Sequence, residues 1–293
     1  MTPTRAAVAS GAASGAASVG ASVAAALAVA ITVAACLAAA LGAAPARAQG
    51  TAAEGIAQYR ALLADGNPAE LWEAKGELLW AQARGPKNAS LQACDLGQGP
   101  GVVKGAFTEL PRYFADTGRV QDMESRLLSC MQTLQGFDAT AIAATPFGKG
   151  EQVNLEALAA WVSSESRGLK FKLPQGHAQE RVAYEVGKRL FYFRAGPYDF
   201  ACASCHGDEG KRIRLQDLPN LSKSPGDGVG FAAWPAYRVS SGELWSMQRR
   251  LNDCYRQQRF PFPGYASDAT IALGVYMGVQ AQGAVSVAPA IKR

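Results

Sequence analysis

Histidine is scarce in this sequence of 293 residues, which contains only His177 and His206. Cysteine is limited to six residues, and only Cys202 and Cys205 lie close together along the chain. A structural zinc site takes about four ligands, drawn mostly from these two residue types. The scarcity therefore argues against zinc and directs attention to the one close cysteine pair.

The first 48 residues have the features of a signal peptide. Arg5 is the only early charge, residues 18–44 are almost wholly apolar, and A-R-A at 46–48 forms an A-x-A cleavage site. We therefore expect a mature chain that begins at Gln49. An uncleaved anchor helix is the alternative, because the apolar run is long enough to span a membrane.

Strong charge of either sign is also missing. The formal net charge is +5, and it falls to +3 when Arg5 and Arg47 leave with the signal peptide. The sequence has no Lys/Arg-rich run, and the glycine-rich stretch 226–230 lacks the lysine and the glycine spacing of a phosphate loop. We therefore expect no nucleic-acid partner.

The close cysteine pair belongs to residues 202–206, which read C-A-S-C-H. Two thiols at this spacing, followed by a histidine, form the pattern for covalent haem c attachment through two thioether bonds. His206 then falls beneath the iron as the proximal ligand. A redox dithiol and a chance match are the alternatives. We predict one haem c per chain, bound covalently by Cys202 and Cys205. Bacterial haem c is attached outside the cytoplasm, which agrees with export to the periplasm.

The mature sequence contains an internal repeat. A G-x-x-L motif lies 18 residues before Cys94 and recurs 18 residues before Cys205. Farther along, seven positions match at a constant offset of 124, including R-L-x-x-C at 126–130 and 250–254. Such a repeat indicates two copies of one structural unit.

Each half is expected to be built mainly from helices. Apolar residues recur every three or four positions, as at Leu71, Ala74 and Leu78, and strand-like alternation is scarce. The fold class that we predict is mainly α, with two tandem cytochrome c-like domains at 49–168 and 179–293 and a linker at 169–178. The expected helices are 69–83, 119–134 and 152–165 in the first half, and 179–193, 242–258 and 267–281 in the second.

The first half lacks the haem motif. Where the motif would fall, this half has Leu91 and Cys94, and Asp95 replaces the proximal histidine. The first domain should therefore carry no haem. Cys94 and Cys130 align with residues beside the haem of the second half, so both should point into the space that a haem would fill. We predict a Cys94–Cys130 disulfide, which export permits, with two free buried thiols as the alternative.

The iron needs a sixth ligand or an open position, and four residues are candidates. Met247 is matched by Met123 in the haemless half, which favours a role in the core. Met277 lies in an apolar segment and also fits the core, and His177 lies in the linker. Cys254 is the strongest candidate, because it is the one mature cysteine left after the haem motif and the predicted disulfide.

Cys254 also has cationic surroundings. On a helix, Arg250 lies one turn before it on the same face. Cations favour the thiolate, which is both a nucleophile and a metal ligand, and arginine binds oxyanions. A solvated cationic face beside a buried cysteine is the alternative. We expect the remaining cations of this segment to form such a solvated face, namely Arg249, Arg256 and Arg259.

These motifs resemble the SoxA family, the haem-bearing catalytic subunits of the SoxAX cytochrome complex of bacterial sulfur oxidation. The resemblance covers nearly all of the mature chain. It rests on C-D-L-G-Q-G-P-G at 94–101, L-P-R-Y-F at 110–114, the haem motif at 202–206, and Arg250 with C-Y-R-Q at 254–257.

The resemblance implies L-cysteine S-thiosulfotransferase activity, in which thiosulfate is joined oxidatively to a cysteine of the carrier SoxYZ. In the family, a cysteine matching Cys254 binds the iron and is modified to a persulfide. An arginine matching Arg250 contacts the substrate. Electrons leave through the haem to SoxX and then to a soluble cytochrome c. The chain is similar to the single-haem members, in which a disulfide replaces the first haem. A non-catalytic electron-transfer cytochrome c is the alternative function.

Overall fold

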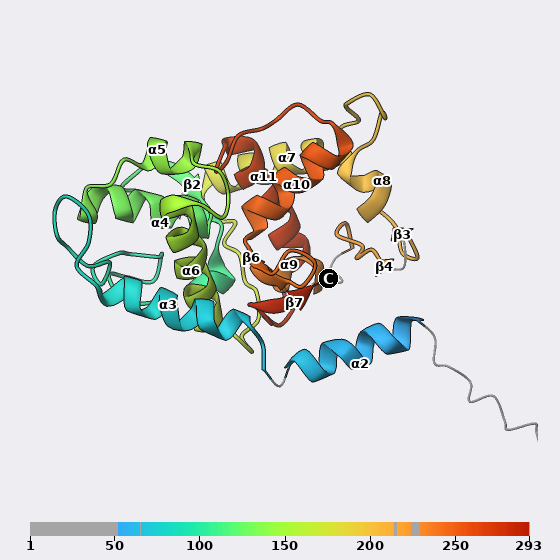
Figure 1. Cartoon of the computed structure of the whole chain (residues 1–293). Helices are drawn as coiled ribbons and strands as arrows, with labels where there is room; N and C mark the ends of the chain where they lie inside the picture. The colour runs from blue at the N-terminus through green and yellow to red at the C-terminus, as the bar shows by residue number, and fades with distance from the viewer. Residues whose placement is uncertain (1–51, 65, 214–215, 224–228, 293) are drawn as a thin grey trace, which may run out of the picture. The chain divides into compact units, whose positions relative to one another are not determined.

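The computed structural model describes residues 52–64, 66–213, 216–223 and 229–292 (Figure 1), so the predicted signal peptide at 1–48 and the start at Gln49 lie outside it. The residues from Ala52 onward belong to one compact unit. Within the described ranges, no helix is both long and apolar enough to cross a membrane.

Helices dominate the described residues. In chain order the α-helices are α2 (Ala52–Ala64), α3 (Ala69–Ala81), α4 (Met123–Cys130), α5 (Ala139–Ala144), α6 (Gly150–Ser164), α7 (Ala178–Tyr192), α8 (Cys202–His206), α9 (Val229–Ala232), α10 (Met247–Gln258) and α11 (Asp268–Gln280). A 3-10 helix, η1 (Ala106–Glu109), and a π-helical turn, η2 (Met131–Gln135), complete the helical elements. The strands are all short: β1 (Arg112–Phe114), β2 (Arg119–Gln121), β3 (Arg212–Ile213), β4 (Gln216–Asp217), β5 (Ala236–Arg238), β6 (Glu243–Trp245) and β7 (Ala290–Lys292).

The two glycines of the G-x-x-L motifs have the same packing role. Helix α3 meets α6 at Gly76, where an added Cβ would overlap the carbonyl oxygen of Ala157. Helix α7 meets α11 at Gly187, where an added Cβ would overlap the carbonyl oxygen of Ala272. In Figure 1 the first pair is cyan and green and the second is yellow and red. Each motif thus allows two helices to approach closely at a position where no side chain fits.

A β-hairpin that the sequence did not predict precedes both α4 and α10. Strand β1 pairs antiparallel with β2, and β5 pairs antiparallel with β6 and parallel with β7. Gly118 and Gly242 lie in the two hairpin turns with φ of 63° and 67°, a conformation that favours glycine. The helices predicted at 119–134 and 242–258 therefore begin too early, because their first residues are extended.

Side-chain caps set where these two helices begin. The Asp122 carboxylate accepts a hydrogen bond from the Ser125 amide at 2.9 Å, and the Ser246 hydroxyl accepts one from the Arg249 amide at 3.1 Å. Such caps satisfy amide groups that have no partner within the helix. They fix the start of α10, the helix that carries Arg250 and Cys254.

The buried face of α3 differs from the one suggested by its apolar spacing. Leu71 and Leu78 are 78% and 71% exposed, whereas Leu79 and Trp80 are buried. The close approach at Gly76 turns that side of the helix toward α6 and leaves the two leucines outside. The apolar spacing thus predicted the helix itself, whereas its buried side is set by Gly76.

The segment predicted as a linker contributes to the core. Phe171 is 2% exposed and packs edge-to-face against Phe107 of the first half and Phe231 of the second. Its amide donates to the Ala284 carbonyl at 2.9 Å, and its carbonyl accepts from the Gly283 amide at 2.9 Å. These contacts tie the connection to the end of the chain.

Candidate functional site

Helix α8 holds both thiols of the haem motif on one short helix. Cys202 and Cys205 are half-buried free thiols. The Gly207 amide closes the turn on the Ala203 carbonyl at 2.8 Å, and an added Cβ at Gly207 would lie only 2.6 Å from that oxygen. The two thiols thus lie three positions apart on one short helix, as in the C-x-x-C-H motif for haem attachment.

The imidazole of His206 is prepared to bind a metal through one defined nitrogen. Its Nδ1 lies 2.9 Å from the Pro219 carbonyl oxygen. A carbonyl only accepts hydrogen bonds, so Nδ1 carries the proton and Nε2 keeps a free lone pair. Burial lowers the pKa of His206, and Arg250 lowers it further, although the bond to Pro219 opposes both. The neutral ring is the form that ligates iron, so these residues fit a covalently bound haem.

Cys254 lies close enough to the haem motif for its charge to act on the motif thiols. Burial raises the pKa of Cys254, the Arg250 guanidinium opposes this, and Asp253 and Cys205 add to the rise. Burial also raises the pKa of Cys202 to about 12, with Cys254 as the next cause. We call this cluster the Cys254 site; it consists of Cys202, Cys205, His206, Arg250 and Cys254.

One carboxylate holds the arginines of this part of α10. Arg250 donates to Asp253 Oδ2 at 3.1 Å, and Arg256 donates to Asp253 Oδ1 at 2.7 Å. The Arg250 guanidinium also lies 6.0 Å from the centre of the Trp234 ring. A single negative charge shared between two arginines leaves this part of the site with excess positive charge.

Arg249 differs from the solvated cation that we expected. Its guanidinium is buried, donates to Glu156 at 3.1 Å, forms a second ion pair with Glu243 and lies 4.7 Å from the Trp245 ring centre. Burial raises the pKa of Glu156 to about 7, although Arg249 opposes this. Arg249 is thus a core residue whose charge is fully balanced, whereas the side chain of Arg256 is 73% exposed, as expected.

The other candidates for the sixth ligand have roles elsewhere. Met277 is 4% exposed in the core of α11, and Met247 lines a small cavity between the halves. His177 caps α7 through Nδ1 and stacks on Tyr113 with ring centres 3.6 Å apart. In the described part of the chain, no group of three or more His, Cys, Asp or Glu side chains is arranged to hold a metal ion. A haem iron takes at most two ligands from the protein, so a haem site needs no such group.

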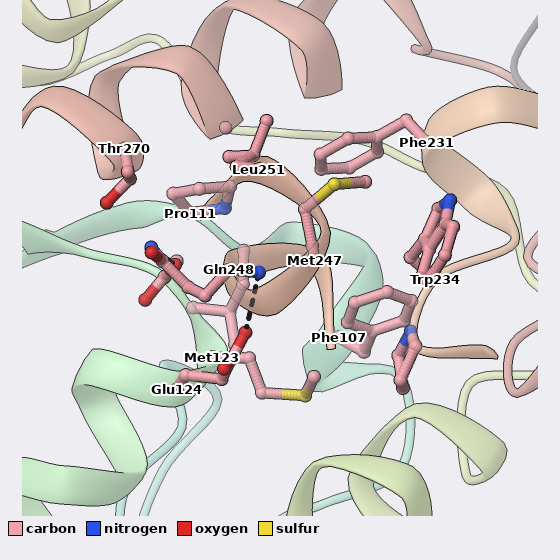
Figure 2. A pocket seen from close by; sticks show the side chains of 14 residues that line it. Phe107, Pro111, Met123, Glu124, Phe231, Trp234, Met247, Gln248, Leu251 and Thr270 are labelled. Carbon is pink, nitrogen blue, oxygen red and sulfur yellow. Dashed lines mark hydrogen bonds between the residues drawn. The ribbon is translucent and has the colours of Figure 1, made fainter. Parts of the chain in front are cut away.

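The cavity between the halves has a volume of about 40 Å³ and lies where α4 and α10 begin. Figure 2 shows Met123 and Met247 beside it, together with Glu124 and Gln248. Glu124 is 3% exposed and accepts hydrogen bonds from the Gln248 amide at 3.2 Å and from the Tyr265 hydroxyl at 2.7 Å. A carboxyl of the first half thus contacts the helix that carries Cys254.

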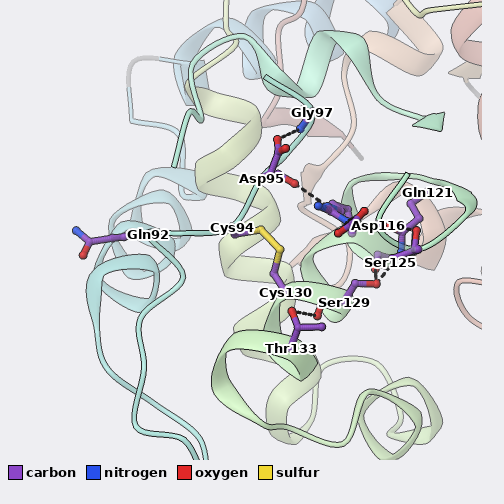
Figure 3. The surroundings of a disulfide bond; sticks show 12 residues. Gln92, Cys94, Asp95, Gly97, Asp116, Gln121, Ser125, Ser129, Cys130 and Thr133 are labelled. Carbon is purple, nitrogen blue, oxygen red and sulfur yellow. Dashed lines mark hydrogen bonds and ion pairs between the residues drawn. A yellow bond between two sulfur atoms is a disulfide. The ribbon is translucent and has the colours of Figure 1, made fainter. Parts of the chain in front are cut away.

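A disulfide joins Cys94 to Cys130 in the first half (Figure 3), and their Cα atoms are 5.6 Å apart. Both residues are almost fully buried. Asp95, at the place of the proximal histidine, accepts hydrogen bonds from the amides of Gly97 at 2.6 Å and Gly99 at 3.0 Å. The side chains that align with the haem site of the second half are here engaged in protein contacts.

Sequence comparison shows which family combines these features. Over 240 residues the chain is 52% identical to the L-cysteine S-thiosulfotransferase subunit SoxA of Hydrogenophilus thermoluteolus, and the match covers 82% of this chain and 88% of that protein. The chain belongs to the SoxA family. A SoxA subunit of Hydrogenobacter thermophilus is 33% identical, over 77% of this chain and 82% of its own length.

Two further comparisons concern the fold of this SoxA-family chain. A family model described as the cytochrome c domain of SoxA/TsdA matches residues 75–171, which lie in the half without the haem motif. The crystal structure of SoxXA from P. pantotrophus superposes with a TM-score of 0.67 at 23% identity, covering 80% of this chain and 84% of that chain. The chain is therefore a mainly helical protein with a cytochrome c-type fold.

One residue near the site of this SoxA-family chain was not predicted from the sequence. Arg238, at the end of β5, interacts electrostatically with Arg250, Asp253 and Cys254. The repeat contained a signal for it, because the position at offset 124 in the first half is Phe114. The two halves thus differ at this position: Arg238 lies near the Cys254 site, where the first half has the aromatic ring of Phe114.

Proposed function

We propose that this chain is the haem c-bearing catalytic subunit of an L-cysteine S-thiosulfotransferase, which joins thiosulfate oxidatively to a cysteine of a SoxYZ carrier. The names of its relatives support the activity. The observation that carries the proposal is the position of Cys254, which shares the surroundings of the two attachment thiols and has Arg250 one helical turn away.

The proposal includes one haem per chain and two tandem cytochrome c-like domains, at 49–168 and 179–293, joined by the segment 169–178. Cys202 and Cys205 would attach the haem, and His206 and Cys254 would bind its iron. The Nδ1 bond of His206, which leaves Nε2 free, supports this ligand set. The disulfide and the contacts of the aspartate at the histidine position support a first domain without haem.

The reaction forms one S–S bond between the carrier thiol and thiosulfate and breaks the S–H bond of the carrier. It releases one proton and two electrons. A bound haem c supplies a one-electron redox centre. Arg250, held by Asp253 at 3.1 Å, balances the charge of the thiosulfate anion as it approaches Cys254. Burial of the site strengthens this attraction, because little water competes with it.

The remaining parts of the proposal concern location and partners. The leader at 1–48 directs the chain to the periplasm. A SoxX-type cytochrome c subunit forms a heterodimer with it, accepts the electrons one at a time and passes them to a soluble cytochrome c. The carrier SoxYZ and thiosulfate are the substrates, and nucleic acid has no part.

A conjugation assay tests this function. The holoprotein with its partner cytochrome is incubated with thiosulfate, oxidised cytochrome c and a cysteine-bearing acceptor, and mass spectrometry follows the acceptor. We expect a thiosulfate adduct with the wild type, and a loss on the order of a hundredfold in Cys254→Ala and Arg250→Ala. Arg119→Ala, which removes an exposed cation of the first half, is the matched control.

An electron-transfer cytochrome would behave differently in this assay. It would exchange electrons with cytochrome c and form no adduct in the wild type. Equal adduct formation by the wild type and Cys254→Ala would also refute the proposal, because the proposal rests on the position of Cys254.

A further inference from the structure

Among the described residues, the guanidinium of Arg238 has a ring contact but no hydrogen-bond or ion-pair partner. It is the last residue of β5, and its side chain lies 5.1 Å from the Trp245 ring centre. Its Nε is buried and has no hydrogen-bond partner. Across the described ranges, no carboxylate forms an ion pair with it. An unpaired buried donor is unfavourable, so an arginine kept in this state indicates a partner from outside the chain.

The charges around Arg238 are not balanced. Burial lowers the pKa of Arg238, and the neighbouring Arg250 lowers it further, whereas Asp253 and Cys254 oppose this. Asp253 already binds Arg250 and Arg256. The charges of Arg238 and Arg250 thus both act on Cys254, while the charge of Asp253 is shared with Arg256. An anion with two negative charges would restore the balance.

The first half shows how the same fold balances one arginine. The guanidinium of Arg126, the counterpart of Arg250, lies 4.0 Å from the Phe114 ring centre and pairs with Asp116 at 2.8 Å. At offset 124, the positions of Phe114 and Asp116 are occupied by Arg238 and Ser240. The haem-bearing half thus has a second cation where the other half has a ring, and a serine where it has a carboxylate.

We propose that Arg238 is a second anion-binding residue of the Cys254 site and acts with Arg250 to hold the sulfonate end of thiosulfate. This assignment rests on the proposed function for the identity of the anion. Two guanidiniums offer several N–H donors to the oxygens of an –SO₃ group, and this leaves the terminal sulfur to face Cys254. The same pair discriminates against sulfide, which has no oxygen atoms to accept these bonds.

The first half also indicates that the fold does not need a cation at this position. Phe114 occupies it in β1 with the same hairpin geometry, since Phe114 pairs with Arg119 as Arg238 pairs with Glu243. Arg238→Phe therefore reproduces an arrangement that the protein already contains. The neutral Arg238→Gln and the charged Arg238→Lys complete the set of variants.

The test measures anion binding separately from catalysis. Isothermal titration of the holoprotein with sulfate, a dianion that matches the sulfonate end but has no transferable sulfur, gives a Kd without turnover. We expect Arg238→Gln and Arg238→Phe to raise this Kd about tenfold or more, as is usual when a charged hydrogen-bond partner is lost. The KM for thiosulfate should rise by a similar factor with kcat changed by less than about threefold, and Arg238→Lys should recover part of the loss.

Thermal melting and the haem spectrum show whether each variant folds. Arg119→Gln, an exposed arginine paired with Asp268, changes the net charge equally and should leave both constants unchanged. Absence of sulfate binding by the wild type, or Kd and KM values in the Gln and Phe variants equal to those of Arg119→Gln, overturns the inference. If the wild type forms no adduct while its sulfate Kd depends on Arg238, the proposed function fails and the anion site stands.

Discussion

Replacing Glu124 by glutamine should change how the stability of the protein depends on pH. Glu124 is buried at the junction of the two halves (Figure 2), and Asp122 lines the same cavity. Burial first, and then the charge of Asp122, raises the pKa of Glu124 to about 8, although hydrogen bonds from Ser246, Tyr265 and Gln248 oppose this. Glutamine has nearly the same shape and keeps a carbonyl oxygen for the Gln248 amide.

The direction in which the free energy of unfolding changes with pH depends on how many protons the folded and the unfolded states bind. An unfolded glutamate ionises near pH 4.5, whereas Glu124 in the folded protein keeps its proton up to about pH 8. Between these values the folded state binds more protons, so the free energy of unfolding falls as the pH rises. One titrating group contributes up to about 1.4 kcal/mol per pH unit in this window, and roughly 4–5 kcal/mol over its width.

Urea unfolding of the holoprotein at pH 5, 6, 7 and 8 measures this contribution. The free energy of unfolding of Glu124→Gln relative to the wild type should increase steadily from pH 5 to pH 8. Glu156, whose pKa is also raised by burial, is present in both proteins, so its effect cancels in the difference. A difference that stays constant from pH 5 to pH 8 would refute the reasoning.

Two further predictions concern the framework of the protein. The Cys94–Cys130 disulfide closes a loop of 36 residues, so Cys94→Ala with Cys130→Ala should lose about 4 kcal/mol of unfolding free energy in urea. A reducing agent should destabilise the wild type and not this double variant; equal effects would contradict the prediction. Gly187→Ala places a methyl group against the Ala272 carbonyl, and it should lower the free energy of unfolding by about 1–3 kcal/mol. Thermal melting measures this loss. Gly176→Ala, where an added Cβ meets no atom within 4 Å, is the matched control, and equal melting temperatures for the two variants would refute the packing argument.

Much of the site was predictable because its signals are local or repeated. The haem motif at 202–206 and the arginine one turn before Cys254 are read from spacing alone. The internal repeat aligned Cys94 with Cys205 at an offset of 111 and Cys130 with Cys254 at an offset of 124, and so pointed to the pair of cysteines that the structure joins. Helix α11 also follows its apolar spacing, with Ile271 and Val275 buried.

The features that were missed depend on contacts between distant residues. Strands β2 and β6 have three residues each, too few for a periodic pattern, and they are defined by pairing across a glycine turn. Arg249 meets Glu156, which lies 93 positions away, so its burial cannot be inferred from its own segment. The buried face of α3 is chosen by the close approach at Gly76 rather than by Leu71 and Leu78.

Electron paramagnetic resonance of the oxidised holoprotein shows directly whether Cys254 binds the haem iron, as proposed. We predict a low-spin signal of histidine–thiolate ligation in the wild type. It should disappear in Cys254→Ala and persist in Met247→Leu, because Met247 lines the cavity between the halves. A methionine–iron charge-transfer band in the optical spectrum of the wild type, unchanged in Cys254→Ala, would contradict the account.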